Sequence, residues 1–329
     1  MLAALGPLAV SLCLIPFMPS FWTITVVVLC FFAAYYVYEP PYRGLYPDML
    51  PASVFGRAQG VQHLLRGIAL GCGLIGGTAL FKLWTPAPFL LAAAVTLVAC
   101  GAVVLFVQED GGQGDVFRGV RAYLRTSWTI FRREPDVRSF LVVNAAWEAA
   151  FAAARVFVLL YFLNGLHESK SIAALGLSGV AVGYATAALL CGGIGDRIGL
   201  ARTCFYASFL YGGGLVLCAA ATKWHWWFPG FIFLFSLAGG TVMTLAWGLL
   251  FKLMPPSERG AVSGLATMTK GIGLVVGPLA AGAAIDLTSS VFPRTNGYQA
   301  LWIVCAVPIV AVMPVVARLA RHERARDRR

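Results

Sequence analysis

Long apolar stretches recur along the whole chain, separated by short polar segments. Each stretch is close to the ~20 residues that an α-helix needs to cross a hydrocarbon core of ~30 Å. Backbone amides cannot stay unpaired in lipid, so helices are the expected form of these stretches. The pattern therefore predicts an all-α polytopic membrane protein with about ten transmembrane helices. The predicted helices cover residues 1–18, 21–46, 58–82, 86–107, 138–163, 171–195, 201–222, 226–251, 260–286 and 298–318.

The composition supports this fold class. Hydrophobic residues make up 59% of the chain and charged residues only 12%, which excludes an ordinary water-soluble domain. The cysteines lie within apolar stretches and form no C-x-x-C or mixed Cys/His spacing. We interpret them as small buried hydrophobic residues, so neither disulfides nor a metal site is predicted. They are Cys13, Cys30, Cys72, Cys100, Cys191, Cys204, Cys218 and Cys305.

The one long polar segment, residues 108–137, divides the chain. Its centre has apolar residues at helical spacing, so it could lie on the membrane surface. The alternative is a plain connector between two helix bundles. The predicted organisation is a partial N-terminal bundle of four helices over 1–107, a cytoplasmic connector over 108–137, a C-terminal bundle of six helices over 138–318, and a basic cytoplasmic tail over 319–329.

Basic residues are distributed unevenly between the two ends of the predicted helices. Of the 25 lysines and arginines, 20 lie on one side of alternate connections and four on the other, while Arg155 lies within a helix. The positive-inside rule places the richer side, with the connector and the C-terminus, in the cytoplasm. We therefore expect a multi-pass protein of the cell membrane (inner or plasma). Because the net charge of +11 follows this topology, nucleic acid is not an expected partner.

The sequence also contains an internal repeat. Residues 44–73 and 248–277 align at an offset of 204 with ten identical positions. Chance similarity between glycine-rich helices is the alternative, but a predicted cytoplasmic loop and a basic residue, Arg66 opposite Lys270, also align. Two parallel halves related by an axis along the membrane normal are a transporter architecture.

The same offset leaves part of the second half without a counterpart. The helices over 138–163 and 171–195 would map to positions before Met1. The second half is thus predicted to have six helices and the first half four. We expect that two helices are missing at the amino end or were never part of the chain.

Several motifs resemble those of the major facilitator superfamily (MFS). GGIGDRIGLAR, residues 192–202, is similar to its cytoplasmic G-x-x-x-D-R-x-G-R-R signature and departs from it at Leu200 and Ala201, where basic residues usually follow. PPSERGAVSGL (255–265) and VVGPLAAGAAID (275–286) are similar to the family's late-helix patterns. The resemblance covers the chain as the family's third to twelfth helices. It implies two helix bundles around a central cavity.

PPYRGLYPDM, residues 40–49, resembles the end of the fourth helix in sucrose-type and glycoside–pentoside–hexuronide carriers. Arg43 and Asp48 match the arginine and aspartate of that pattern. In the sucrose type this arginine is implicated in proton-coupled sugar transport. The acid that those carriers place about three turns earlier is missing here, since Phe32 stands at that position, and Glu39 offers a nearby carboxylate instead.

Four charged residues within apolar helices are candidates for transport and coupling. Glu148 lies ~15 Å from the helix entry, near the membrane midplane, where a charge is costly and should face a cavity or a partner. Arg155 follows two turns later on the same face. Either another helix neutralises each of them, or Glu148 is the coupling carboxylate and Arg155 its partner or a substrate anchor. Glu39 and Arg43, four residues apart, form either an interface anchor or a gate.

Other polar residues are weaker candidates. Those for the substrate cavity are Asn144, Trp147, Thr241, Thr244 and Trp247. For each aromatic residue the alternative is packing. Those for a conformational latch are Asp196, Arg197 and Asp48, with Asp196 and Arg197 expected to join two helices across a short loop.

The sequence has no H-E-x-x-H, G-x-S-x-G or Walker motif, so neither an enzyme nor a cofactor is predicted. The predicted function is secondary active transport of a small solute, such as a sugar or glycoside, by alternating access with proton coupling. The expected partners are this solute, the coupling ion and the lipid bilayer. The alternatives are a truncated or non-transporting membrane protein (a remnant, scaffold or sensor), or an exporter of drugs or metabolites.

Overall fold

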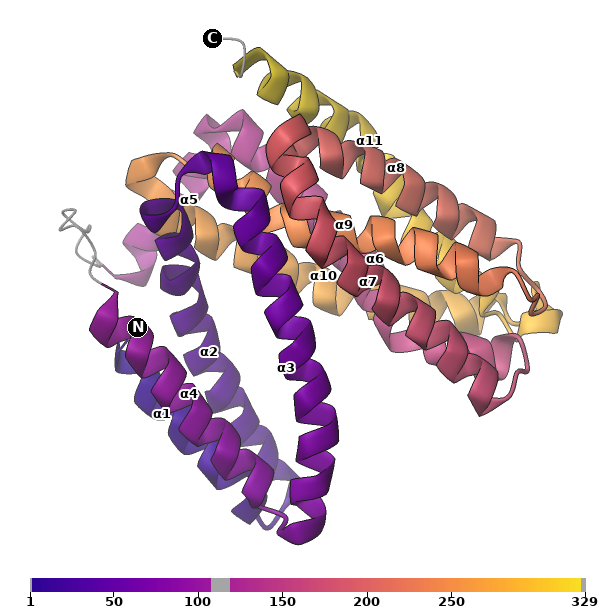
Figure 1. The fold of residues 1–329 in the computed structure, drawn as a ribbon, viewed down its shortest axis with the longest axis horizontal. Helices are drawn as coiled ribbons and strands as arrows, with labels where there is room; N and C mark the ends of the chain where they lie inside the picture. The colour runs from indigo at the N-terminus through magenta and orange to yellow at the C-terminus, as the bar shows by residue number, and fades with distance from the viewer. Residues whose placement is uncertain (1, 108–118, 327–329) are drawn as a thin grey trace. The chain divides into compact units, whose positions relative to one another are not determined.

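A computed structural model describes residues 2–107 and 119–326 (Figure 1). The described chain is helical, and its α-helices are α1 (Leu2–Leu14), α2 (Phe21–Met49), α3 (Phe55–Leu83), α4 (Ala87–Phe106), α5 (Val120–Arg133), α6 (Pro135–Leu160), α7 (Lys170–Ile198), α8 (Leu200–Ala219), α9 (Phe228–Leu253), α10 (Arg259–Thr288) and α11 (Gln299–Arg326). Short 3-10 or π turns join some of them. Part of the predicted connector, 108–118, and the last three residues of the predicted tail lie outside the described residues.

The predicted fold class is confirmed. In the described ranges, eight helices are long and apolar enough to cross a membrane, and a shorter apolar helix covers Ala3–Phe17. With α8, which has 20 residues, these correspond to the ten predicted transmembrane helices. α5 is the additional helix, and it lies within the polar segment between the two halves of the sequence.

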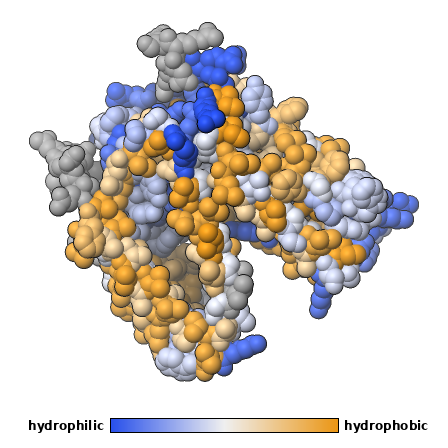
Figure 2. All heavy atoms as spheres, viewed as in Figure 1, coloured by the Kyte–Doolittle hydropathy of each residue, from blue (hydrophilic) through white to orange (hydrophobic). Residues whose placement is uncertain are grey.

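The first compact unit contains α1, α2, α4, most of α3 and the start of α10. α1 packs against both α2 and α4. Its core is centred on Ala4, Leu8, Ala34 and Tyr38, and further aromatic side chains pack against these residues. Figure 2 shows apolar residues along the sides of these helices and hydrophilic residues mainly toward their ends, as expected of helices that face lipid.

The second unit contains α6 to α9, α11, most of α10 and the first turns of α3. Glycines allow its helices to approach closely: a Cβ atom on Gly183 of α7 would lie 2.7 Å from the Phe233 carbonyl oxygen of α9. Large side chains such as Phe140, Leu245 and Leu301 fill the rest of its core. Small residues at crossings are typical of membrane helices, which gain little from burying apolar surface against each other.

Several helices extend beyond their predicted ends, and α2 and α11 are the two that matter for the site. α2 continues to Met49 although Pro40, Pro41 and Pro47 lie inside it. α11 continues to Arg326, so most of the segment predicted as a tail is helical. The physical reason is that α11 keeps a buried face in this segment, where Leu319 and Glu323 are both buried.

Candidate functional site

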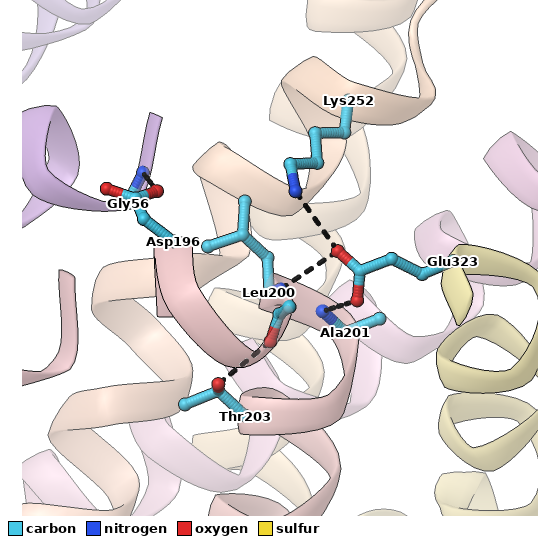
Figure 3. Close-up of polar contacts among 8 residues, drawn as sticks. Gly56, Asp196, Leu200, Ala201, Thr203, Lys252 and Glu323 are labelled. Carbon is cyan, nitrogen blue, oxygen red and sulfur yellow. Dashed lines mark hydrogen bonds and ion pairs between the residues drawn. The ribbon is translucent and has the colours of Figure 1, made fainter. Parts of the chain in front are cut away.

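The turn between α7 and α8 is the part of the chain that resembles the superfamily signature. α7 ends at Ile198, and Gly199 adopts a φ of +111°, which favours glycine because it has no Cβ atom. α8 begins at the next residue. This sharp turn places Asp196 and the first backbone amides of α8 close together, and each takes part in a separate contact with a distant helix (Figure 3).

Asp196 caps the start of α3. Its Oδ1 atom accepts a hydrogen bond from the Gly56 amide at 2.8 Å, and its Oδ2 atom accepts from the Arg57 amide at 3.0 Å. The Arg57 side chain adds a contact at 3.2 Å but is 63% exposed, so the ion pair itself contributes little. The carboxylate, only 4% exposed, satisfies two amides that the helix cannot pair internally and interacts favourably with the helix dipole.

Glycines allow Asp196 to reach these amides. A Cβ atom on Gly56 would lie 2.6 Å from the Gly192 carbonyl oxygen, and one on Gly192 would lie 2.6 Å from the Gly56 carbonyl oxygen. One turn later, a Cβ atom on Gly60 would lie 2.6 Å from the Ala188 carbonyl oxygen. The two backbones are therefore in direct contact over two turns. We call this crossing of α3 and α7, with its Asp196 cap, the α3–α7 latch.

Gln59 lies inside the latch. Its side chain is 0% exposed and reaches α9, since its Cγ atom lies 3.5 Å from the position of a Cβ atom on Gly248. Neither polar atom of its amide has a hydrogen-bond partner among the residues that the structure describes. A buried amide without partners weakens the contact that buries it.

Glu323 of α11 makes the second contact at the signature turn. Its Oε1 atom accepts hydrogen bonds from the Leu200 amide at 2.9 Å and the Lys252 ammonium group at 3.3 Å, while Oε2 accepts from the Ala201 amide at 2.8 Å. The two positions at which the sequence departs from the signature thus contribute backbone amides. A Cβ atom on Gly199 would lie 2.7 Å from Oε2, so the glycine also serves this contact.

The predicted charge pair of α2 is present. Arg43 Nε lies 3.7 Å from Glu39 Oε1, and both side chains are buried. The helix continues through Pro40 and Pro41, which preserves the four-residue spacing on one face. Further along α2, Asp48 forms an ion pair with Arg259 at the start of α10.

On α6, Glu148 and Asn144 face α10. A Cβ atom on Gly273 of α10 would lie 2.7 Å from the Glu148 Cβ atom. Asn144 Nδ2 donates hydrogen bonds to Thr269 Oγ1 at 3.1 Å and to the Ala266 carbonyl oxygen at 3.4 Å. Both side chains are buried.

Other predicted site residues lie elsewhere. Arg155 and Arg197 are both exposed. Asp196 joins α7 to the start of α3, where Gly56 lies 140 residues earlier in the chain. Trp147 donates its indole N–H to Ser208 of α8 at 3.1 Å and is buried, which favours the packing interpretation. On α9, Thr244 and Trp247 are buried as well.

One remaining candidate on α9, Thr241, is partly buried and donates its hydroxyl to the Leu237 carbonyl oxygen at 2.8 Å. Sequence reasoning did not identify Gln59 or Glu323 as functional residues. For Glu323 a signal exists: Val316, Leu319 and Glu323 continue one helical face of α11, which places the acid on the side that packs.

The comparisons agree with this architecture. A profile of the Major Facilitator Superfamily matches residues 148–329, more than half of the sequence. The chain therefore belongs to the Major Facilitator Superfamily. This confirms the resemblance to the superfamily that the sequence motifs indicated. No curated protein matches the sequence.

Three solved structures are similar in fold. The MFS transporter FucP in the outward conformation has a TM-score of 0.77 at 11% identity, covering 96% of this chain and 81% of FucP. The human organic anion transporter MFSD10 (TETRAN) has a TM-score of 0.78 at 16% identity, covering 96% of this chain and 76% of MFSD10. A bacterial homologue of the iron transporter ferroportin, outward-facing, has a TM-score of 0.72 at 13% identity, covering 97% and 82%. At these identities the likeness concerns the fold.

Proposed function

We propose that this protein is a secondary transporter that moves a small solute across the membrane by alternating access. The α3–α7 latch is the observation that carries the proposal. It joins a helix of the first repeat half to a helix of the second through backbone contact and one buried carboxylate. A transporter whose halves rock around a central site must make and break such a contact in each cycle.

We assign proton coupling to Glu148 and the solute site to the α6 face around it. A carboxylate deep in a membrane span is a functional candidate because it is costly to keep there. Asn144, one turn away, offers an amide that can exchange its hydrogen bonds to α10 for bonds to a solute hydroxyl. Arg155, two turns after Glu148 on the same helix, is the proposed charge partner of Glu148 or an anchor for the solute.

Glu39 and Arg43 form a second element of the proposal, a charged gate on α2. Both side chains are buried, so the attraction between their charges weakens when water reaches them and raises the local dielectric constant. The match of Arg43 and Asp48 to sucrose-type carriers, and the likeness in fold to FucP, described as an E. coli fucose:proton symporter, support a sugar-like solute.

The proposed topology follows the distribution of basic residues. The N-terminal bundle (1–107) and the C-terminal bundle (138–318) span the cell membrane, and the connector over 108–137 and the C-terminus are cytoplasmic. This orientation places the latch, the signature turn and Glu323 on the cytoplasmic side.

The test is solute-driven proton movement in proteoliposomes. The purified full chain is reconstituted with a pH-sensitive dye inside, and a panel of mono- and disaccharides is added outside. We expect one sugar class to acidify or alkalinise the lumen, and Glu148→Gln to abolish this proton movement while exchange of radiolabelled sugar persists. Glu168→Gln, a half-buried glutamate between α6 and α7, is the matched control. Transport of no solute by correctly inserted protein would favour a scaffold or sensor.

A further inference from the structure

The helix α5 has two different faces. Tyr123, Ser127 and Ile130 recur at helical spacing on one side, where Ser127 and Ile130 are buried and Tyr123 is half-buried. This side packs onto the protein. The opposite side carries Arg121, Arg125, Trp128 and Arg132, all of them exposed. We call these four residues the basic face of α5.

The basic face combines arginines with one large aromatic ring. Trp128 is 55% exposed, and the Arg132 guanidinium lies over its ring at 4.8 Å. No acidic residue lies within Val120–Arg133, and the nearest one, Glu134, pairs with Arg133, outside this face. Arg121, Trp128 and Arg132 therefore present positive charge and an amphipathic ring together on a helix that contains no acidic residue.

α5 directly precedes a predicted membrane-spanning helix in the chain. α5 ends at Arg133 and α6 begins at Pro135, so a single residue separates it from a helix that is long and apolar enough to cross the bilayer. The end of a membrane-spanning helix lies among lipid headgroups, where tryptophan and arginine are both favoured. Arginine also matches phosphate geometry, because its planar guanidinium donates two parallel hydrogen bonds.

We propose that the basic face of α5 binds the phosphate headgroups of anionic phospholipids in the membrane that holds the protein. The bound lipid anchors the segment between the two halves of the sequence to the bilayer surface. This inference does not depend on transport or on the identity of a solute.

The test measures lipid retention by the purified full chain. Delipidated protein is titrated with phosphatidylglycerol or phosphatidylcholine in detergent, and bound lipids are counted by native mass spectrometry. One arginine near an anionic surface contributes about fivefold in affinity. The variant R121Q/R132Q should therefore lose about 25-fold in affinity for phosphatidylglycerol, with phosphatidylcholine binding unchanged. Lys82→Gln with Lys170→Gln, two exposed lysines outside α5, is the matched control and should change neither.

Two further arms distinguish the sources of the binding. Trp128→Ala keeps every charge and should lower retention less than R121Q/R132Q does, because the arginines remain. Inorganic phosphate at the same concentration as the lipid should not displace it. Equal loss in the lysine control, or full displacement by inorganic phosphate, would overturn the proposal. Elution of each variant as a single monodisperse peak establishes that it is folded.

Discussion

Replacing Gln59 by leucine should strengthen the α3–α7 latch. The Gln59 amide is fully buried and its two polar atoms have no hydrogen-bond partner in the described part of the chain. A buried polar group left in this state costs about 1–3 kcal/mol. In the closed latch, leucine fills a similar volume against α9 without that cost. In the open latch, where α3 has left α7 and water reaches the side chain, glutamine does not bear the cost either. Gln59→Leu should therefore favour the closed latch by about 1–3 kcal/mol, or 5- to 150-fold.

The assay has a stability arm and a functional arm. Gln59→Leu should raise the free energy of unfolding in mild denaturant and slow solute turnover, because opening the latch becomes harder. Gln62→Leu, one turn further along α3 and half-buried, is the matched control: Gln62 takes part in a contact of its own, so this substitution should not raise stability. A loss of stability of 1 kcal/mol or more in Gln59→Leu would refute the reasoning, since it would mean that the amide makes a bond worth keeping.

Three other substitutions test the remaining contacts. Asp196→Ala should leave the Gly56 and Arg57 amides uncapped and weaken the closed latch by about 1–3 kcal/mol, seen as faster proteolysis near α3; unchanged cleavage would contradict the cap. Glu323→Gln should lower the free energy of unfolding by about 1.5–3 kcal/mol, whereas no change would show that the Lys252 contact is dispensable. Gly273→Ala should lower the free energy of unfolding by about 1–3 kcal/mol and impair transport, because the new Cβ atom collides with Glu148. Gly271→Ala should be tolerated, since no atom lies within 4 Å of its new Cβ atom, and equal effects of the two substitutions would contradict the α6–α10 contact.

Much of the fold could be predicted from the sequence because lipid imposes the pattern. A helix that crosses hydrocarbon needs about 20 apolar residues, so length and hydropathy define each span. Local spacing was equally informative: Glu39 and Arg43, four residues apart, pair as a regular helix requires despite the prolines between them.

The tertiary contacts of the candidate site could not be predicted in the same way. Asp196 binds amides 139 and 140 residues earlier, and Glu323 binds amides 122 and 123 residues earlier. No local pattern encodes either partner. Backbone amides carry no side-chain signal at all, so Gly56 and Leu200 look like ordinary residues in the sequence. For Trp147, proximity in the sequence was misleading. It directly precedes Glu148, which suggested a place in the cavity, but adjacent residues lie on different faces of a helix, and Trp147 contacts Ser208 in the core.

The most direct test of alternating access is a distance measurement across the latch. Spin labels on Ser53→Cys, before α3, and Ile198→Cys, at the end of α7, occupy exposed sites on its two sides; the native cysteines that are not buried are replaced by alanine. In lipid nanodiscs, pulsed electron paramagnetic resonance should reveal two populations, one with a short and one with a longer distance between the labels. Asp196→Ala should increase the longer-distance population, and Gln59→Leu should increase the shorter-distance one. A single distance that neither substitution shifts would contradict the account.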